Sequence, residues 1–193
     1  MLQLHFEPNS RHLEILKHTN TRYEFETHCG TYHGEVLDER QVRILMTEID
    51  HWGDIDISDL FSAQHSEYIQ VGVPHCVFEI DRNLDELDII ESARDIRYHS
   101  HFKNGANVNF AKLINKNTVV MRTYERGVEN ETKSCGTGTV ATALTFAKKY
   151  SIKNRVNIIA PGGHLSVSFD ENYSKVWLEG PVDLLFSREV EKA

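Results

Sequence analysis

CGTGTVATALTFAKKY, residues Cys135–Tyr150, is the stretch that most directly indicates the fold. Its apolar residues recur at the spacing i, i+3, i+4, i+7, which is typical of one face of an α-helix. Further apolar side chains cover the other faces, and Lys148 and Lys149 are the first charges. A helix that is apolar nearly all round is a buried one. The four periodic positions are Val140, Ala143, Leu144 and Ala147.

Short segments with strand character lie on both sides of this helix. A second helix is predicted over Asn83–Tyr98, with Asn83 as its N-cap, and residues 72–75 and 180–181 are expected to separate strands. Many strands and two helices, one of them buried, predict an α+β fold with a curved β-sheet wrapped around a central helix. The predicted strands are Arg22–His28, Tyr32–Leu37, Gln41–Met46, Tyr68–Val71, Cys76–Ile80, Asn107–Ile114, Thr118–Tyr124, Val156–Ala160, Leu165–Phe169, Lys175–Leu178 and Val182–Phe186.

Composition excludes several classes of partner. The chain has 193 residues and a net charge of −8, with its acidic residues spread along the sequence. Nucleic-acid binding needs clustered Lys and Arg, so we expect no nucleic-acid partner. No apolar run approaches the ~18 residues of a membrane span, so we also expect no membrane association. The first residues lack the features of a signal peptide, and we expect the protein to be cytoplasmic.

The cysteines and histidines indicate neither disulfides nor a metal site. Three cysteines, Cys29, Cys76 and Cys135, are widely spaced, which favours reduced thiols over a disulfide framework. The 11 histidines show no HxxxH or HExxH spacing. We therefore expect no bound metal ion.

The start of the buried helix has features of a chemical site. Cys135 is followed by Gly136, Thr137 and Gly138, small residues that let a ligand approach the backbone. Free N–H groups and the positive end of the helix dipole meet there, which lowers the pKa of a thiol and attracts a carboxylate. The pattern therefore predicts an activated thiolate beside an anion-binding site.

Three alternatives compete with this interpretation. Cys135 could be a small buried hydrophobic residue beside a glycine turn. The letters Gly136-x-Gly138-x-x-Ala141 fit a dinucleotide-binding fingerprint, but the polar loop Val128–Ser134 separates them from the preceding strand. Cys135 could also form a hydrolase dyad with His75, which the sequence cannot place beside it.

Several motifs, taken together, resemble diaminopimelate epimerase. They occur in that family's order and at its approximate spacing, and the match runs from about Tyr23 to about Phe186. A single motif such as PGG would carry no weight alone. The motifs are Gly72-Val73-Pro74-His75-Cys76-Val77, Asn107-Val108-Asn109-Phe110, Arg122-Thr123-Tyr124-Glu125-Arg126-Gly127, Glu131-Thr132, Ser134-Cys135-Gly136-Thr137-Gly138 and Pro161-Gly162-Gly163.

The resemblance implies an amino-acid epimerase that converts LL- to meso-diaminopimelate, on the route to lysine and peptidoglycan precursors, without pyridoxal phosphate or any other cofactor. One cysteine thiolate removes the α-proton, and a second cysteine protonates the opposite face. Cys135 matches one of the pair, and Gly136 and Thr137 would hold the α-carboxylate. Glu125 and Arg126 would fix the distal amino and carboxylate groups of the substrate, with Asn107 helping. His75 and Glu125 would lie near the thiols as catalytic residues.

Two departures from the family pattern bear on activity. Val73 replaces the family's usual asparagine, which removes one polar contact to the distal end of the substrate. A CGNG-type motif, which carries the family's other catalytic cysteine, does not occur in this sequence. Neither Cys29 nor Cys76 is expected to replace it. We therefore expect a truncated and impaired epimerase.

The family architecture has two similar lobes. The resemblance implies that residues 48–177 form the complete second lobe with Cys135, and that 1–47 and 178–193 are part of the first. Exposed strand edges in a partial lobe favour a homodimer or other self-association. Two further functions stay open: a racemase or isomerase of the same fold for another amino acid, suggested by Val73, and a non-catalytic remnant or interaction module, suggested by the missing thiol.

Overall fold

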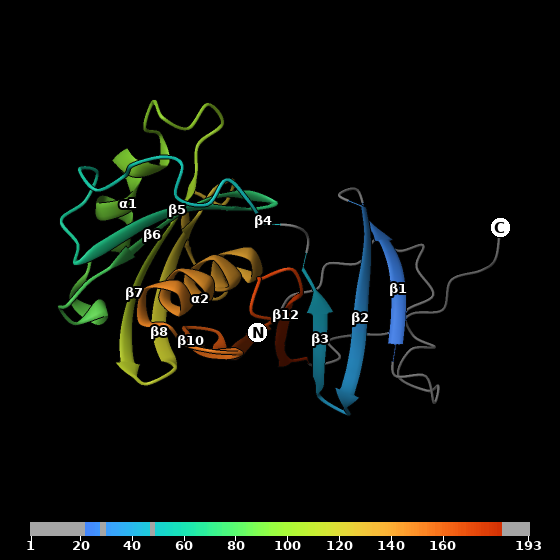
Figure 1. Cartoon of the computed structure of the whole chain (residues 1–193). Helices are drawn as coiled ribbons and strands as arrows, with labels where there is room; N and C mark the ends of the chain where they lie inside the picture. The colour runs from blue at the N-terminus through green and yellow to red at the C-terminus, as the bar shows by residue number, and fades with distance from the viewer. Residues whose placement is uncertain (1–21, 28–29, 47–48, 183–193) are drawn as a thin grey trace.

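A computed structural model describes residues 22–27, 30–46 and 49–182 of the chain. It confirms the α+β class: within these residues one curved sheet wraps around helix α2, Gly136–Tyr150 (Figure 1). The strand order is β1-β2-β3-β12-β11-β10-β8-β7-β6-β5-β4, with β9 paired to β8. The strands are β1 Arg22–Thr27, β2 Gly30–Asp38, β3 Gln41–Leu45, β4 Ile49–Asp50, β5 His65–Val71, β6 Val73–Glu79, β7 Asn107–Asn115, β8 Thr118–Glu125, β9 Asn130–Thr132, β10 Arg155–Ala160, β11 Gly163–Phe169 and β12 Val176–Pro181.

Helix α2 is buried, as its composition predicts. Residues 138–147 are all buried, and the helix contacts β5–β8 and β10–β12. Its apolar side chains form one core cluster with the concave face of the sheet, in which Leu144 is fully buried and Phe146 is 1% exposed. The two lysines at its end form ion pairs: Lys148 with Glu67, and Lys149 with the buried carboxylate of Glu79.

The opposite face of β6–β8 is covered by a second core cluster and by short helices. A single helix over Asn83–Tyr98 is wrong: Asn83 caps the 3₁₀ turn η2, Leu84–Glu86, and α1, Ile89–Arg97, begins only after the N-cap Asp88. The backbone is extended at both positions between them, with ψ of 123° at Leu87 and 99° at Asp88. The side chains of Asn83 and Asp88 each accept from a backbone N–H at the start of their own helix, so two helices form here instead of one. The apolar spacing that predicts a single helix is therefore shared between two short ones.

Arg122 explains why this break is stable. Its guanidinium donates to the carbonyl oxygens of Leu84 and Leu87, at 2.6 and 3.0 Å, which are the first residue and the C-cap of η2. The same guanidinium forms two 2.7 Å hydrogen bonds to the carboxylate of Glu131 on β9. A bidentate pair of this kind fixes geometry as well as charge, so it ties η2 to β8 and β9.

Two turns differ from their predictions. Residues 72–75 are not a loop: Gly72 alone, at φ 68°, reverses the chain, and Val71 pairs with Val73 on the next strand. The positive φ favours glycine at this position. At the other end, Gly180 and Pro181 belong to β12 and pair with Val42 and Gln41 of β3. The predicted strand Val182–Phe186 lies outside the described residues apart from Val182.

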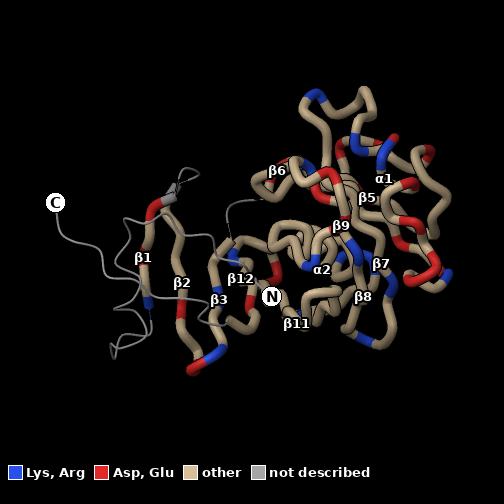
Figure 2. The backbone as a smooth tube through the Cα atoms, turned by 180° about the vertical axis from the view of Figure 1, so that it is seen from behind, with Lys and Arg blue, Asp and Glu red and all other residues tan. Residues whose placement is uncertain are grey.

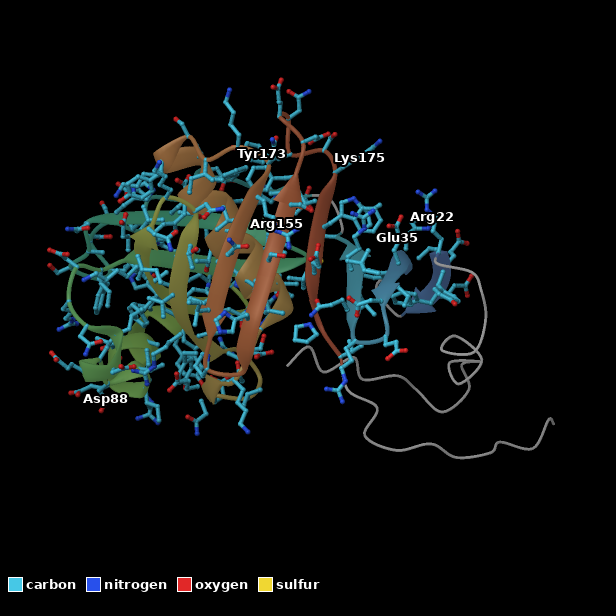
Figure 3. The ribbon with its side chains drawn as sticks, turned by 90° about the horizontal axis from the view of Figure 1, so that it is seen from below. Arg22, Glu35, Asp88, Arg155, Tyr173 and Lys175 are labelled. Carbon is cyan, nitrogen blue, oxygen red and sulfur yellow. The ribbon has the colours of Figure 1, made fainter. Side chains whose placement is uncertain are left out.

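Strands β1–β3 extend the sheet beyond β12 as antiparallel neighbours, away from α2 (Figure 1). This confirms the three strands predicted over residues 22–46, although His28 and Cys29 are outside the described residues. Arg22 and Glu35 lie together here, 3.0 Å apart (Figure 3). Arg155 lies on the outer face of the sheet, where its guanidinium pairs with Glu179 at 2.7 Å (Figure 3).

Charged residues are dispersed over the described part of the chain, with Lys and Arg interleaved among Asp and Glu (Figure 2). Among the helices that the structure describes, none has the length and apolar character needed to cross a bilayer.

The central helix gives a prediction about stability. Leu144→Ala should lower the free energy of unfolding by about 2–5 kcal/mol, because it leaves a cavity in a fully buried site. Urea denaturation followed by circular dichroism measures this change.

The matched control is Ile90→Ala on α1, whose side chain is 43% exposed and which should change stability by less than about 0.5 kcal/mol. Equal effects of the two substitutions would contradict a core built around α2.

Candidate active site

Cys135 is the N-cap residue of α2, in an extended conformation with φ −119° and ψ 113°. Its carbonyl oxygen accepts from the Thr139 N–H at 2.8 Å, which begins the helix. The sulfur lies 3.6 Å from the Thr137 hydroxyl oxygen. The Cys135 side chain forms no capping hydrogen bond, but the N–H groups of Thr137 and Gly138 lie close enough to act on its pKa. The thiol thus lies at the start of the buried helix, where the sequence places it.

The pKa of this thiol differs from the prediction. Burial raises the pKa of Cys135, and the carboxylate of Glu125 raises it further; the Thr137 hydroxyl and the N–H groups of Gly138 and Thr137 oppose these effects without overcoming them. Cys135 is only 6% exposed. The predicted lowering of the Cys135 pKa is therefore wrong. The sequence indicates the helix end, but it shows neither the burial of the sulfur nor the carboxylate of Glu125 beside it.

Strand alternation explains why polar residues collect near this helix end. Successive side chains on a strand point to opposite faces of a sheet, and on β6–β8 the odd-numbered positions Val77, Ala111 and Met121 pack in the core cluster of α2. Further odd-numbered positions on the same strands carry the polar side chains of His75, Asn107, Asn109, Thr123 and Glu125. These five therefore share the face covered by α2, toward its N-terminal end.

The same alternation separates the two described thiols. Cys76 follows His75 on β6 and packs in the cluster on the opposite face, with Tyr68 and Phe78. It is fully buried, and burial raises its pKa strongly. Cys135 and Cys76 are thus on opposite faces of the sheet. Cys29 lies outside the described residues.

His75 is fully buried and hydrogen-bonded within the sheet. Its Nδ1 lies 3.2 Å from the side-chain nitrogen of Asn109, and its backbone is in register with Asn107 on the parallel neighbour β7. Burial, helped by the positive charge of Arg126, lowers the pKa of His75 to about 3, so the imidazole is neutral at physiological pH. Its hydrogen-bond partner is Asn109 rather than Cys135, which disfavours a hydrolase dyad.

Glu125 and Arg126 lie where β8 ends in a tight turn. The carboxylate of Glu125 accepts from the Thr132 hydroxyl at 2.8 Å. The Arg126 N–H donates to the side-chain oxygen of Asn107 at 2.7 Å, which ties the turn to β7. The Arg126 guanidinium reaches the carbonyl oxygen of Asn104, at 3.4 Å.

The turn itself is held by Glu129, at φ 57°, after Gly127 at φ 91°. The Glu129 carboxylate accepts from the Gly127 N–H at 3.0 Å and from the guanidinium of Arg97, whose Nη2 is 2.7 Å away. These contacts fix the direction in which Glu125 and Arg126 leave β8.

The structure thus gathers the residues that the sequence predicts for a site: Cys135, Gly136 and Thr137 from the helix start, and His75, Asn107, Glu125 and Arg126 from the strand ends. It adds Asn109 and Thr123, which sequence analysis did not single out. The alternation Asn107-x-Asn109 on a predicted strand could have indicated that Asn109 shares the face of Asn107, because residues two apart on a strand point to the same side. Within the described part of the chain, no three His, Cys, Asp or Glu side chains are grouped as metal ligands.

Comparison with known proteins gives the family. The sequence profile described as diaminopimelate epimerase matches residues 67–185. The diaminopimelate epimerase of Hydrogenobaculum sp. (strain Y04AAS1) is 37% identical over 166 residues, which cover 84% of this chain and 60% of the relative. That of Chlorobaculum tepidum is 35% identical over 179 residues, 91% of this chain and 68% of the relative.

Among solved structures, a hydroxyproline epimerase from Agrobacterium vitis, with bound trans-4-hydroxy-L-proline, shares the fold. Its TM-score is 0.59 at 16% identity, over 83% of this chain and 56% of that one. The chain spans about 60% of the length of the Hydrogenobaculum relative. The sequence match over most of the chain, on the fold described above, shows that the chain belongs to the diaminopimelate epimerase family.

Proposed function

We propose that this chain exchanges the α-proton of diaminopimelate as one half of a cofactor-free, two-cysteine epimerase site. The observation that carries the proposal is the position of Cys135, the N-cap residue of α2, whose thiol feels both the N–H groups of the helix start and the carboxylate of Glu125. A free thiol is required, which fits a reducing cytoplasm. The substrate assignment is supported by the names of the relatives.

In the proposed step, the Cys135 thiolate takes the proton from the α-carbon, which leaves a thiol and a carbanion. The electron pair delocalises onto the α-carboxylate, and the N–H groups of Gly136 and Thr137 donate to that carboxylate. Preorganised donors in a buried site stabilise such developing charge more than water does. Return of the proton from the thiol, or of a deuteron after solvent exchange, restores the amino acid.

The remaining residues orient the substrate and limit its chemistry. Glu125 and Arg126 hold the distal ammonium and carboxylate groups, with Asn107 fixing the Arg126 backbone. Glu125 also raises the pKa of Cys135, which makes the thiolate a stronger base. His75 stays neutral and contributes a polar contact.

Inversion needs a second acid on the other side of the α-carbon. Cys76 is not that acid, because β6 places it on the opposite sheet face. We therefore propose that Cys135 exchanges the α-proton faster than the chain inverts the centre, as an impaired epimerase would, because the second described thiol lies on the other sheet face. In this proposal residues 48–177 form one complete lobe, residues 1–47 and 178–193 belong to the other, and the protein associates with itself as a homodimer or other oligomer.

The first prediction concerns Cys135. Wild-type protein incubated with diaminopimelate in heavy water should lose the α-proton NMR signal, and Cys135→Ala should slow this loss by about 100-fold or more, the range of a general base. Inversion is followed in the same samples by chiral chromatography.

Cys76→Ala is the matched control, because it removes a buried thiol from the other face and should leave exchange within about threefold, a spread that corresponds to less than 1 kcal/mol. Exchange that survives Cys135→Ala would contradict the assignment. No exchange by wild-type protein with any amino acid would favour the non-catalytic remnant.

The second prediction concerns Glu125. Glu125→Gln should lower the pKa of Cys135, because it removes a negative charge that disfavours the thiolate while keeping an acceptor for Thr132. The pH profile of Cys135 alkylation by iodoacetamide, quantified by peptide mass spectrometry, should then move to lower pH. Glu129→Gln, an equal change of charge in the adjoining turn, is the control, and an identical shift in both variants would contradict direct action by Glu125.

The third prediction addresses the alternative substrate. Val73 is half-buried on β6, two residues before His75 and on the same face. Val73→Asn should raise exchange of diaminopimelate relative to alanine by roughly 3–10-fold, the effect of one added hydrogen bond. Ile114→Asn, at an exposed position, should not change this ratio. Faster exchange of another amino acid by the wild type, with no gain in Val73→Asn, would favour the racemase or isomerase alternative.

A further inference from the structure

Three buried polar side chains form a chain across neighbouring strands, next to the start of α2. The Thr123 hydroxyl on β8 donates to Asn109 Oδ1 on β7 at 3.0 Å. Asn109 Nδ2 lies 3.2 Å from His75 Nδ1 and 3.1 Å from the Cys76 carbonyl oxygen, both on β6. All three side chains are at most 3% exposed. Each hydrogen bond therefore constrains the next without competition from bulk water.

The orientation of the Asn109 amide follows from its partners. A carbonyl oxygen can only accept, so the atom facing the Cys76 carbonyl must be the NH₂ group, which places Oδ1 toward the Thr123 hydroxyl. The same NH₂ group faces His75 Nδ1. Because this group can only donate, His75 Nδ1 must accept, and it carries no proton.

The state of the imidazole follows in turn. A neutral histidine has one donor and one acceptor nitrogen, so the hydrogen is on Nε2, on the side of the ring away from Asn109. His75 Nε2 is buried and has no hydrogen-bond partner among the described residues. Buried polar atoms are nearly always paired. Because His75 lies on the sheet face covered by α2, toward the N-terminal end of that helix, this donor is available to a ligand bound there.

We propose that Asn109 is a positioning residue that, held by Thr123, fixes His75 as the Nε2–H tautomer, so that His75 donates a hydrogen bond to the anionic substrate or thiolate and does not act as the base. The participation of His75 in the site rests on the proposed function, whereas its tautomer does not. A neutral donor stabilises negative charge in the transition state and leaves the α-proton to Cys135.

Asn109 is also linked to the helix start. A Cβ at Gly138 would lie 2.6 Å from Asn109 Oδ1 and 3.3 Å from Cys135 Sγ. The amide therefore packs against the first turn of α2, at the residue that also lies next to the thiol. One side chain thus connects the orientation of His75 with the backbone that holds Cys135.

The test is the tautomer of His75, read without substrate from long-range ¹H–¹⁵N correlation spectra of protein with ¹⁵N-labelled histidine. His75→Gln identifies the signal by its loss. Wild-type protein at neutral pH should show Nε2–H over Nδ1–H by about ten to one, the population ratio that one buried hydrogen bond sustains. In Asn109→Asp, a carboxylate that can only accept faces Nδ1, so Nδ1 should become protonated.

Thr123→Val keeps the shape of the side chain but removes the donor to Asn109, and it should lower the Nε2–H preference at least several-fold. Thr145→Val, which removes a buried hydroxyl with no partner in the described chain, should leave the tautomer unchanged. This pair tests the proposal even if Asn109→Asp does not fold. A wild-type Nδ1–H tautomer, or equal spectra for Thr123→Val and Thr145→Val, would overturn it.

The two proposals fail separately. In the heavy-water assay, Thr123→Val should slow α-proton exchange more than Thr145→Val does. Absence of exchange in the wild type, with the expected tautomer present, would overturn the proposed function alone. Exchange with the Nδ1–H tautomer would overturn only the role of Asn109.

Discussion

The two-residue period of a β-strand is the constraint on which this structure depends. On β6, β7 and β8 it directs one set of side chains to α2 and the other to the second core cluster. On the sheet face that contacts α2, the strand residues near the helix start are polar, and those beside the middle of the helix are apolar. They become polar again at Glu79, which binds the lysine and tyrosine that end the helix. A shift of one residue in any of these strands would bury the wrong set.

That arrangement also sets the chemistry of Cys135. The helix start offers N–H donors to the sulfur, yet burial and Glu125 act in the opposite direction and determine the sign of the pKa change. A thiol that is hard to ionise gives a thiolate of high basicity. In the proposed removal of a proton from carbon, the basicity of the thiolate matters more than the ease of forming it in the free protein. In that proposal the ammonium group of the substrate, bound near Glu125, would reduce the opposing charge.

Much of this could be inferred from the sequence, for identifiable reasons. The buried helix is evident because its apolar residues leave no polar face, and the strands around it are short and bounded by turn residues. The helix break at Leu87 could not be predicted, because it depends on Arg122, 35 residues further along the chain. The chain from Thr123 to His75 was missed for the same reason, since it joins three strands whose pairing no local pattern specifies. Likewise, the pKa of Cys135 depends on depth within the fold, which periodicity does not measure.

Strand β12 has a further consequence for how the molecule is made. It is the partner through which β1–β3 join the rest of the sheet, with Leu45 opposite Trp177. A ribosome adds about 5–20 residues each second, so the early hairpins wait on the order of ten seconds before their neighbour emerges. During that interval their open edge is available to other chains. Shielding of the nascent chain during this interval would therefore limit misassembly.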